Sequence, residues 1–161
     1  MKRLETIANI AVIVAALVLV VFVGRQEWER HRAARTPAER LVGTRVQLPG
    51  IQFGGQNKTL VIAISANCHF CRDSEPFYKQ LVAQTQGRLQ VVAVLPQPQT
   101  EAENYVHNAI APSVHVVSSQ LNAIGVIGTP TLLLVDGSGK VRKAWVGFLD
   151  AAGRQQMQAQ L

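Results

Sequence analysis

The chain contains two cysteines, Cys68 and Cys71, which are separated by two residues. An apolar run, residues 60–64, precedes the pair, and a segment with helical periodicity follows it. Two thiols at this spacing lie on one face of a helix and within bridging reach, so they can form a reversible disulfide. They could equally form a permanent structural bridge, or bind a soft metal ion such as copper(I) with a third ligand. The pair therefore indicates thiol chemistry of one of three kinds.

A junction between a strand and a helix would make the two thiols unequal. With Cys68 at the first helical position, unpaired backbone N–H groups and the helix dipole favour its thiolate and lower its pKa. Cys71, one turn later, would be shielded and would resolve the mixed disulfide that Cys68 forms. Between them, a protonated His69 would stabilise the thiolate and make the pair more oxidising, whereas Phe70 adds no charge.

Composition narrows the possible partners. The 161 residues carry a formal net charge of +6, much of it within the first 45 residues, and no later basic stripe alternates with aromatic residues. We therefore expect no nucleic-acid partner. Two cysteines are too few for the disulfide framework of a small secreted domain. The histidines show no i, i+4 metal-binding spacing, so we expect no resident metal and no other cofactor; they are His31, His69, His107 and His115.

An apolar stretch near the N-terminus predicts a membrane anchor. Residues 7–23 are apolar except for Asn9, and about 17 residues is the short end of a membrane-spanning helix. A cleaved signal peptide is less favoured, because Phe22 would occupy the −3 position where a small residue is needed. We therefore predict an uncleaved signal-anchor, a single transmembrane helix.

The charges beside this stretch conflict over its orientation. Lys2 and Arg3 form a short positive flank that would stay in the cytoplasm. Four arginines closely follow the stretch, and their count alone would keep that side in the cytoplasm too: Arg25, Arg30, Arg32 and Arg35. Charge alone therefore argues against export of the C-terminal domain.

The remaining pattern predicts alternating strands and helices. A short helix over residues 37–42 and an edge strand over residues 45–48 come first, and Pro76 should kink the helix that carries the cysteines. Alternation gives parallel strands and the final hairpin gives an antiparallel pair, which is an α/β fold with a central mixed sheet flanked by helices. Strands are expected over residues 60–65, 89–95, 113–117, 131–135 and 140–146, and helices over residues 69–84, 100–108, 118–124 and from Asp150 to the C-terminus.

These features resemble the thioredoxin superfamily, and within it the membrane-anchored, redoxin-type thioredoxin-like proteins of the bacterial cell envelope. The matching residues are the strand before Cys68, the Cys-His-Phe-Cys sequence, Pro76 five residues after Cys71, and Gly-Thr-Pro-Thr over residues 128–131. The resemblance implies a thioredoxin-like fold over residues 44–161. It also implies a cis bond between Thr129 and Pro130, which would face the cysteines and hold a substrate chain.

Two positions depart from thioredoxin itself. Asn67 stands where thioredoxin has a tryptophan before the first cysteine, and Ile62 stands where it has a buried aspartate that transfers protons. The proton of Cys71 must therefore pass to water or to another acid, for which Glu75 is the candidate.

The sequence thus predicts a membrane-bound thiol-disulfide oxidoreductase with a redox-active disulfide. It would act on protein thiols or disulfides together with a redox partner protein. We expect a membrane anchor (residues 1–24), a juxtamembrane stalk (25–43) and a thioredoxin-like domain (44–161). Because anchored members of the family face outward, the resemblance places the domain in the periplasm on a single-pass inner-membrane helix. The alternatives are a thioredoxin-fold copper(I) chaperone, which needs a further ligand beside the cysteines, and a non-catalytic adaptor with a permanent bridge.

Overall fold

The computed structural model describes residues 13–26, 28, 36–54 and 58–161. The chain divides into two units, residues 1–36 and residues 37–161, and each is described by itself. In the first unit, residues 13–26 are helical and their side chains are exposed. Residues 7–12 of the predicted anchor lie outside the described residues. Among the described residues, no helix is both long enough and apolar enough to cross a membrane.

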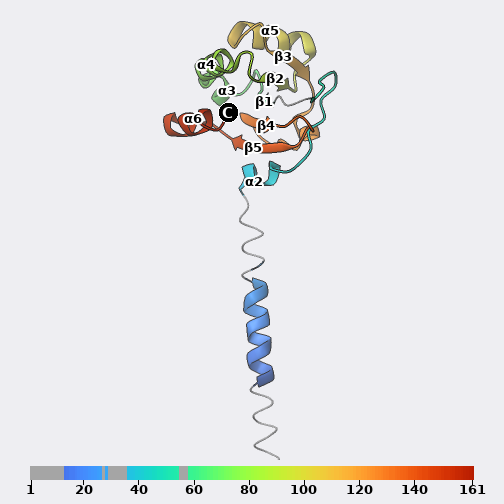
Figure 1. The fold of residues 1–161 in the computed structure, drawn as a ribbon, viewed down its shortest axis with the longest axis vertical. Coiled ribbons are helices and arrows are strands. Elements are labelled where there is room, and N and C mark those ends of the chain that lie inside the picture. The colour runs from blue at the N-terminus through green and yellow to red at the C-terminus, as the bar shows by residue number, and fades with distance from the viewer. Residues whose placement is uncertain (1–12, 27, 29–35, 55–57) are drawn as a thin grey trace, which may run out of the picture. The chain divides into compact units, whose positions relative to one another are not determined.

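The second unit is built on a five-stranded mixed sheet in the order β3-β2-β1-β4-β5 (Figure 1). β1 runs parallel to β2, and β2 runs parallel to β3. β4 is antiparallel to both of its neighbours, β1 and β5. The predicted α/β architecture is therefore confirmed. The strands are β1 (Thr59–Ala63), β2 (Gln90–Leu95), β3 (His115–Ser118), β4 (Thr131–Val135) and β5 (Val141–Val146).

Apolar side chains pack against both faces of this sheet, and β1 is therefore buried along its whole length. Leu60 and Ile62 point into one core and Val61 and Ala63 into the other, as the alternation of a strand requires. Four helices pack over the first face, namely α3 (His69–Asp73), α4 (Glu75–Thr85), α5 (Gln99–Ala109) and α6 (Ala151–Gln158). The second face is covered by α2 (Pro37–Leu41), the 3₁₀ helix η1 (Leu121–Ile124) and the segment after α2.

The start of the folded unit differs from the sequence-based expectation. α2 contacts β5 and buries Leu41 in the second core, so this unit already begins at Pro37, within the predicted stalk. The edge strand predicted over residues 45–48 is wrong, since only an isolated bridge joins Arg45 to Lys140. Pro49 cannot donate a hydrogen bond and Gly50 turns the chain at a φ of 73°, which stops further pairing.

The helix that carries the cysteines is broken rather than continuous. α3 ends at Asp73 and α4 begins at Glu75, with Ser74 between them. Pro76 lies in the first turn of α4, where a missing N–H costs nothing, but it cannot continue a helix from α3. The hydroxyl of Ser74 donates to the carbonyl of Phe70 at 2.8 Å and closes the end of α3. The predicted kink is thus confirmed as a break two residues before the proline.

Candidate active site at the Cys-x-x-Cys turn

Cys68 lies at the point where the chain leaves β1 and enters α3. It is the N-cap of α3, with φ −92° and ψ 117°, one position before the first helical residue to which the sequence assigned it. Its Sγ accepts the backbone N–H of Cys71 at 3.2 Å. The side chain is only partly buried, so its sulfur can meet another molecule.

Cys71 occupies the opposite environment. Its side chain is 0% exposed and belongs to the core under the helices. Both cysteines are free thiols here. Burial, followed by the hydrogen bond and charge of Cys68, raises the pKa of Cys71 to about 12. The chain therefore keeps this thiol protonated and out of water.

The pKa of Cys68 moves in the other direction. Partial burial raises it, but a hydrogen bond from the Cys71 side chain and the backbone N–H groups of Cys71 and Phe70 outweigh that effect. The net result is a pKa below the ordinary value for cysteine. A thiol that ionises readily and lies near the surface is suited to nucleophilic attack, as the sequence predicts for Cys68.

The loop before β4 faces the first cysteine. The Thr129–Pro130 peptide bond is cis, which confirms the expectation from the family resemblance. The Cys68 thiol donates to the Thr129 carbonyl, at a distance of 3.6 Å between Sγ and O. The loop is held by the Thr131 hydroxyl, which donates to the Gly128 carbonyl at 2.8 Å. The structure thus brings the predicted substrate-binding residues to the predicted nucleophile, although they are 61 residues apart.

The two residues between the cysteines both point outward. The His69 ring lies 3.2 Å from the Asp73 carboxylate, one turn along α3, and its side chain is 72% exposed. No hydrogen bond in the described residues joins His69 to Cys68, so its tuning role stays a prediction. The Phe70 ring is 54% exposed and lies 6.1 Å from the ring of Phe148.

The acid proposed for proton transfer is engaged elsewhere. Glu75 accepts a hydrogen bond from the Tyr105 hydroxyl at 2.9 Å, and among the described residues no bond links it to either cysteine. The contact with Glu75 and, above all, burial raise the pKa of Tyr105. Ile62 is fully buried in β1, where it pairs with Ala93 and Leu132. The role of Glu75 therefore stays a prediction.

Two residues that the sequence did not single out line one side of the site. Phe148 follows β5 and is 46% exposed, and Arg154 lies on α6. The Arg154 guanidinium lies 5.2 Å from the ring centres of both Phe148 and Phe77. An exposed aromatic residue just beyond a strand is a signal that could have been noticed, but the partners of Phe148 come from α3 and α6 and are not visible in the sequence.

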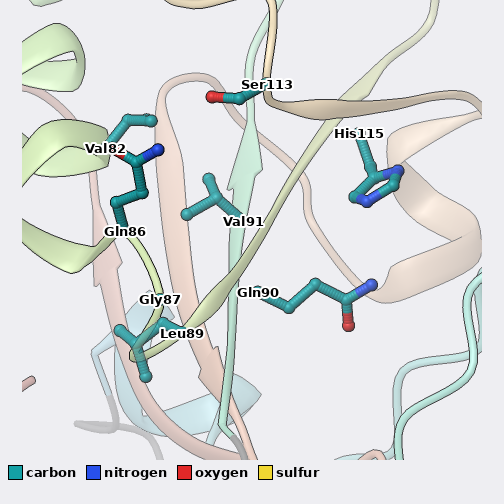
Figure 2. A pocket seen from close by; sticks show the side chains of 8 residues that line it. All are labelled: Val82, Gln86, Gly87, Leu89, Gln90, Val91, Ser113 and His115. Carbon is teal, nitrogen blue, oxygen red and sulfur yellow. The ribbon is translucent and has the colours of Figure 1, made fainter.

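Other features of the described residues lie away from this chemistry. No three His, Cys, Asp or Glu side chains in the described ranges form a group that could hold a metal ion. A cavity of ≈ 190 Å³ is lined by Gln90 at the start of β2 and His115 at the start of β3, among other residues. Figure 2 shows the side chains that line it. Because β1 and β2 are parallel and Cys68 follows the other end of β1, this cavity lies at the opposite end of the sheet.

Comparison with solved structures identifies the architecture. A thiol:disulfide interchange protein assigned as DsbE, from Chlorobium tepidum, superimposes with a TM-score of 0.60 at 26% identity, covering 74% of this chain and 94% of its own. The fold is thioredoxin-like. A thiol:disulfide interchange protein from Bacteroides sp. gives a TM-score of 0.55 at 18% identity, covering 73% of this chain and 86% of its own.

A third neighbour is StoA from Bacillus subtilis, with a TM-score of 0.53 at 15% identity, covering 73% of this chain and 92% of its own. The neighbours below 25% identity are evidence for the fold alone. The Chlorobium protein, at 26% identity, supports a place in the thioredoxin superfamily and a function like that of a thiol-disulfide oxidoreductase. No family model matches the chain, and no protein with a curated description does.

Proposed function

We propose that this protein is a thiol-disulfide oxidoreductase that exchanges disulfides with other proteins through Cys68 and Cys71. One observation carries the proposal: two free thiols lie at a helix start, where the backbone N–H of Cys71 donates to Cys68 Sγ, and one thiol is accessible while the other is fully buried. That asymmetry is what stepwise exchange needs, because one thiol must attack first and the second must wait.

In the reducing direction, the Cys68 thiolate attacks one sulfur of a substrate disulfide and releases the other sulfur as a thiolate. The Cys71 thiolate then attacks Cys68 Sγ, breaks the mixed disulfide and releases the second substrate sulfur. The substrate gains two electrons and two protons, and the protein keeps the Cys68–Cys71 disulfide. A dithiol protein of the same chemical class restores the reduced pair, and every step can run in reverse.

The mixed disulfide itself would activate the second thiol. Two of the causes that raise the pKa of Cys71, after burial, are its hydrogen bond to Cys68 and the charge of Cys68. Once Cys68 is bonded to the substrate, its sulfur carries no charge, so the pKa of Cys71 falls from its value in the dithiol. The released proton passes to water or to Glu75.

The substrate would lie across an open surface rather than in a pocket. Thr129 offers backbone groups beside Cys68, next to its cis bond with Pro130, and two apolar side chains with large exposed fractions lie together at the site. They are Phe70 at 54% and Phe148 at 46%. An extended protein segment with apolar residues around its cysteine fits such a surface better than a small disulfide does.

We further propose that residues 7–23 anchor the protein in the inner membrane and that the domain faces the periplasm. The support is the apolar run in the sequence and the helical, exposed apolar side chains of its described part. Fractionation of cells that express the full chain tests the anchor, and reporter fusions after Leu161 test the orientation. A reporter that is active only in the cytoplasm would reverse the assignment.

Disulfide exchange by the full chain is the direct test of the function. The reduced protein should reduce a model protein disulfide such as that of insulin, and a dithiol should restore it over many turnovers. Replacing Cys68 by serine should lower the rate to that of buffer. A wild-type rate that is no higher than that of the Cys68→Ser variant would refute the proposal.

A further inference from the structure

Gln97 is a polar side chain buried beside the turn that carries Cys68. It is 8% exposed and lies between Pro96 and Pro98 in the loop after β2. Each proline fixes its own φ and restricts the residue before it, so this loop has little backbone freedom. The Ser118 hydroxyl donates to the Gln97 carbonyl at 2.6 Å. The loop therefore holds Gln97 firmly at the sheet edge where β1 also ends.

The Gln97 side chain reaches the cysteine turn through one residue. Its Nε2 donates to Ser65 Oγ at 2.9 Å. The same Oγ accepts the backbone N–H of Asn67 at 3.3 Å, and the Ser65 carbonyl accepts the N–H of Cys68 at 3.1 Å. Ser65 thus closes the turn over residues 65–68, and Gln97 fixes Ser65.

This arrangement leaves an atom without a partner. The Oε1 of Gln97 is buried and accepts no hydrogen bond from any of the described residues. An unpaired buried acceptor lowers stability, and an apolar side chain of the same size would avoid that cost. Packing alone therefore does not account for a glutamine at this position, whereas its Nε2 contact with Ser65 does.

We propose that Gln97 is a positioning residue for the redox turn: its amide holds Ser65, and Ser65 holds Cys68 where its Sγ meets the N–H of Cys71. The inference deepens the proposed function and rests on it for its biological meaning. The place of Cys68 Sγ can nevertheless be followed by alkylation, which needs no disulfide exchange.

The test replaces Gln97 by methionine in the full chain. Methionine has a similar length, and it removes both the Nε2 donor and the unpaired Oε1. The pH profile of Cys68 alkylation should move up by about 0.5 unit, and the rate at a pH well below the wild-type midpoint should fall about threefold. The urea midpoint should stay the same or rise. Gln90→Met is the matched control, because the Gln90 amide accepts a hydrogen bond from Thr59 at the opposite end of β1 and has no bond to the turn in the described residues.

Other titratable groups will not obscure the profile. The charge of Cys68 acts on Cys71 and Tyr78, and burial raises the pKa of both. His69 lies beside Cys68 in sequence but pairs with Asp73. Neither Gln97→Met nor Gln90→Met removes a hydrogen bond to these groups, so a difference between the two variants reports a change in the turn over residues 65–68.

A double-variant cycle tests the route through Ser65. If Gln97 acts by holding Ser65, then Gln97→Met combined with Ser65→Ala should shift the profile no further than the larger single shift. An unshifted profile for Gln97→Met, with or without a loss of stability, would overturn the inference, and so would strictly additive shifts. Failure of wild-type exchange with a shifted Gln97→Met profile would refute the proposed function only.

Discussion

Cys68 and Cys71 are three residues apart and chemically identical, yet they lie in opposite surroundings. Cys68 caps α3 near the protein surface, where the Cys71 side chain and backbone N–H groups donate hydrogen bonds to its sulfur and lower its pKa. Cys71 lies in the core against apolar side chains, where burial raises its pKa to about 12. A single helical turn therefore separates a thiol that favours its charged form from one that resists it.

The contrast shows how a small fold gives two identical thiols different pKa values. The helix start supplies donors to only one of the two sulfurs, because the unpaired N–H groups of a helix occur only in its first turn. The sheet supplies burial to the other, because α3 lies over β1 and turns Cys71 inward. Three experiments test this contrast and the packing around it.

The largest expected effect is on alkylation of the two thiols. Because the pKa of Cys68 is lowered, more of it is thiolate at neutral pH than of an ordinary cysteine, and iodoacetamide should modify it faster than free cysteine. Cys71 should react roughly a thousandfold or more slowly. Peptide mapping after timed alkylation at several pH values measures both rates. Equal labelling of the two cysteines in the folded chain would contradict the contrast.

A smaller effect is expected when Arg154, which packs on Phe77 and Phe148 beside the site, is replaced. Arg154→Ala removes two ring contacts and the bond from Arg154 Nε to the Leu149 carbonyl, so it should lower the free energy of unfolding by about 1–2 kcal/mol. Gln155→Ala, on the exposed side of the same helix, is the matched control. Urea unfolding measures both variants, and identical midpoints would show that the arginine does not tie α6 to α4.

The smallest effect is expected in the core near Cys71. The Tyr78 hydroxyl is buried and has no hydrogen-bond partner among the described residues. Tyr78→Phe should therefore leave stability unchanged or raise it by up to about 1 kcal/mol. Tyr105→Phe, which loses the bond to Glu75, should instead cost about 1 kcal/mol. Equal losses in the two variants would mean that the Tyr78 hydroxyl has a partner in solution.

Local patterns in the sequence were enough to predict most of the fold. The apolar run before Cys68, the position of Pro76 and the turn before the last strand each act over a few residues, so periodicity and turn chemistry record them. The edge strand over residues 45–48 was predicted wrongly because alternation was visible there, whereas a strand also needs a neighbour to pair with over several residues, and only the bridge from Arg45 to the distant Lys140 forms.

The site was only partly predictable for the same reason. The cysteines and the Thr129–Pro130 loop belong to motifs, but the bond from Gln97 to Ser65 joins residues 32 positions apart. The stack of Arg154 on Phe77 and Phe148 joins α4 to α6. No spacing rule connects such pairs, because only the packed sheet and helices bring them together. The pairing of His69 with Asp73 is an exception, since i, i+4 neighbours on a helix are readable from sequence.

Trapping of the mixed disulfide tests most directly whether Cys68 attacks and Cys71 resolves. Reduced Cys71→Ser and Cys68→Ser variants of the full chain are each mixed with a disulfide-bonded model protein, and the products are separated on a non-reducing gel. The Cys71→Ser variant should accumulate a covalent complex that dithiothreitol releases, whereas the Cys68→Ser variant should form none. A complex formed by Cys68→Ser and absent from Cys71→Ser would contradict the assigned roles.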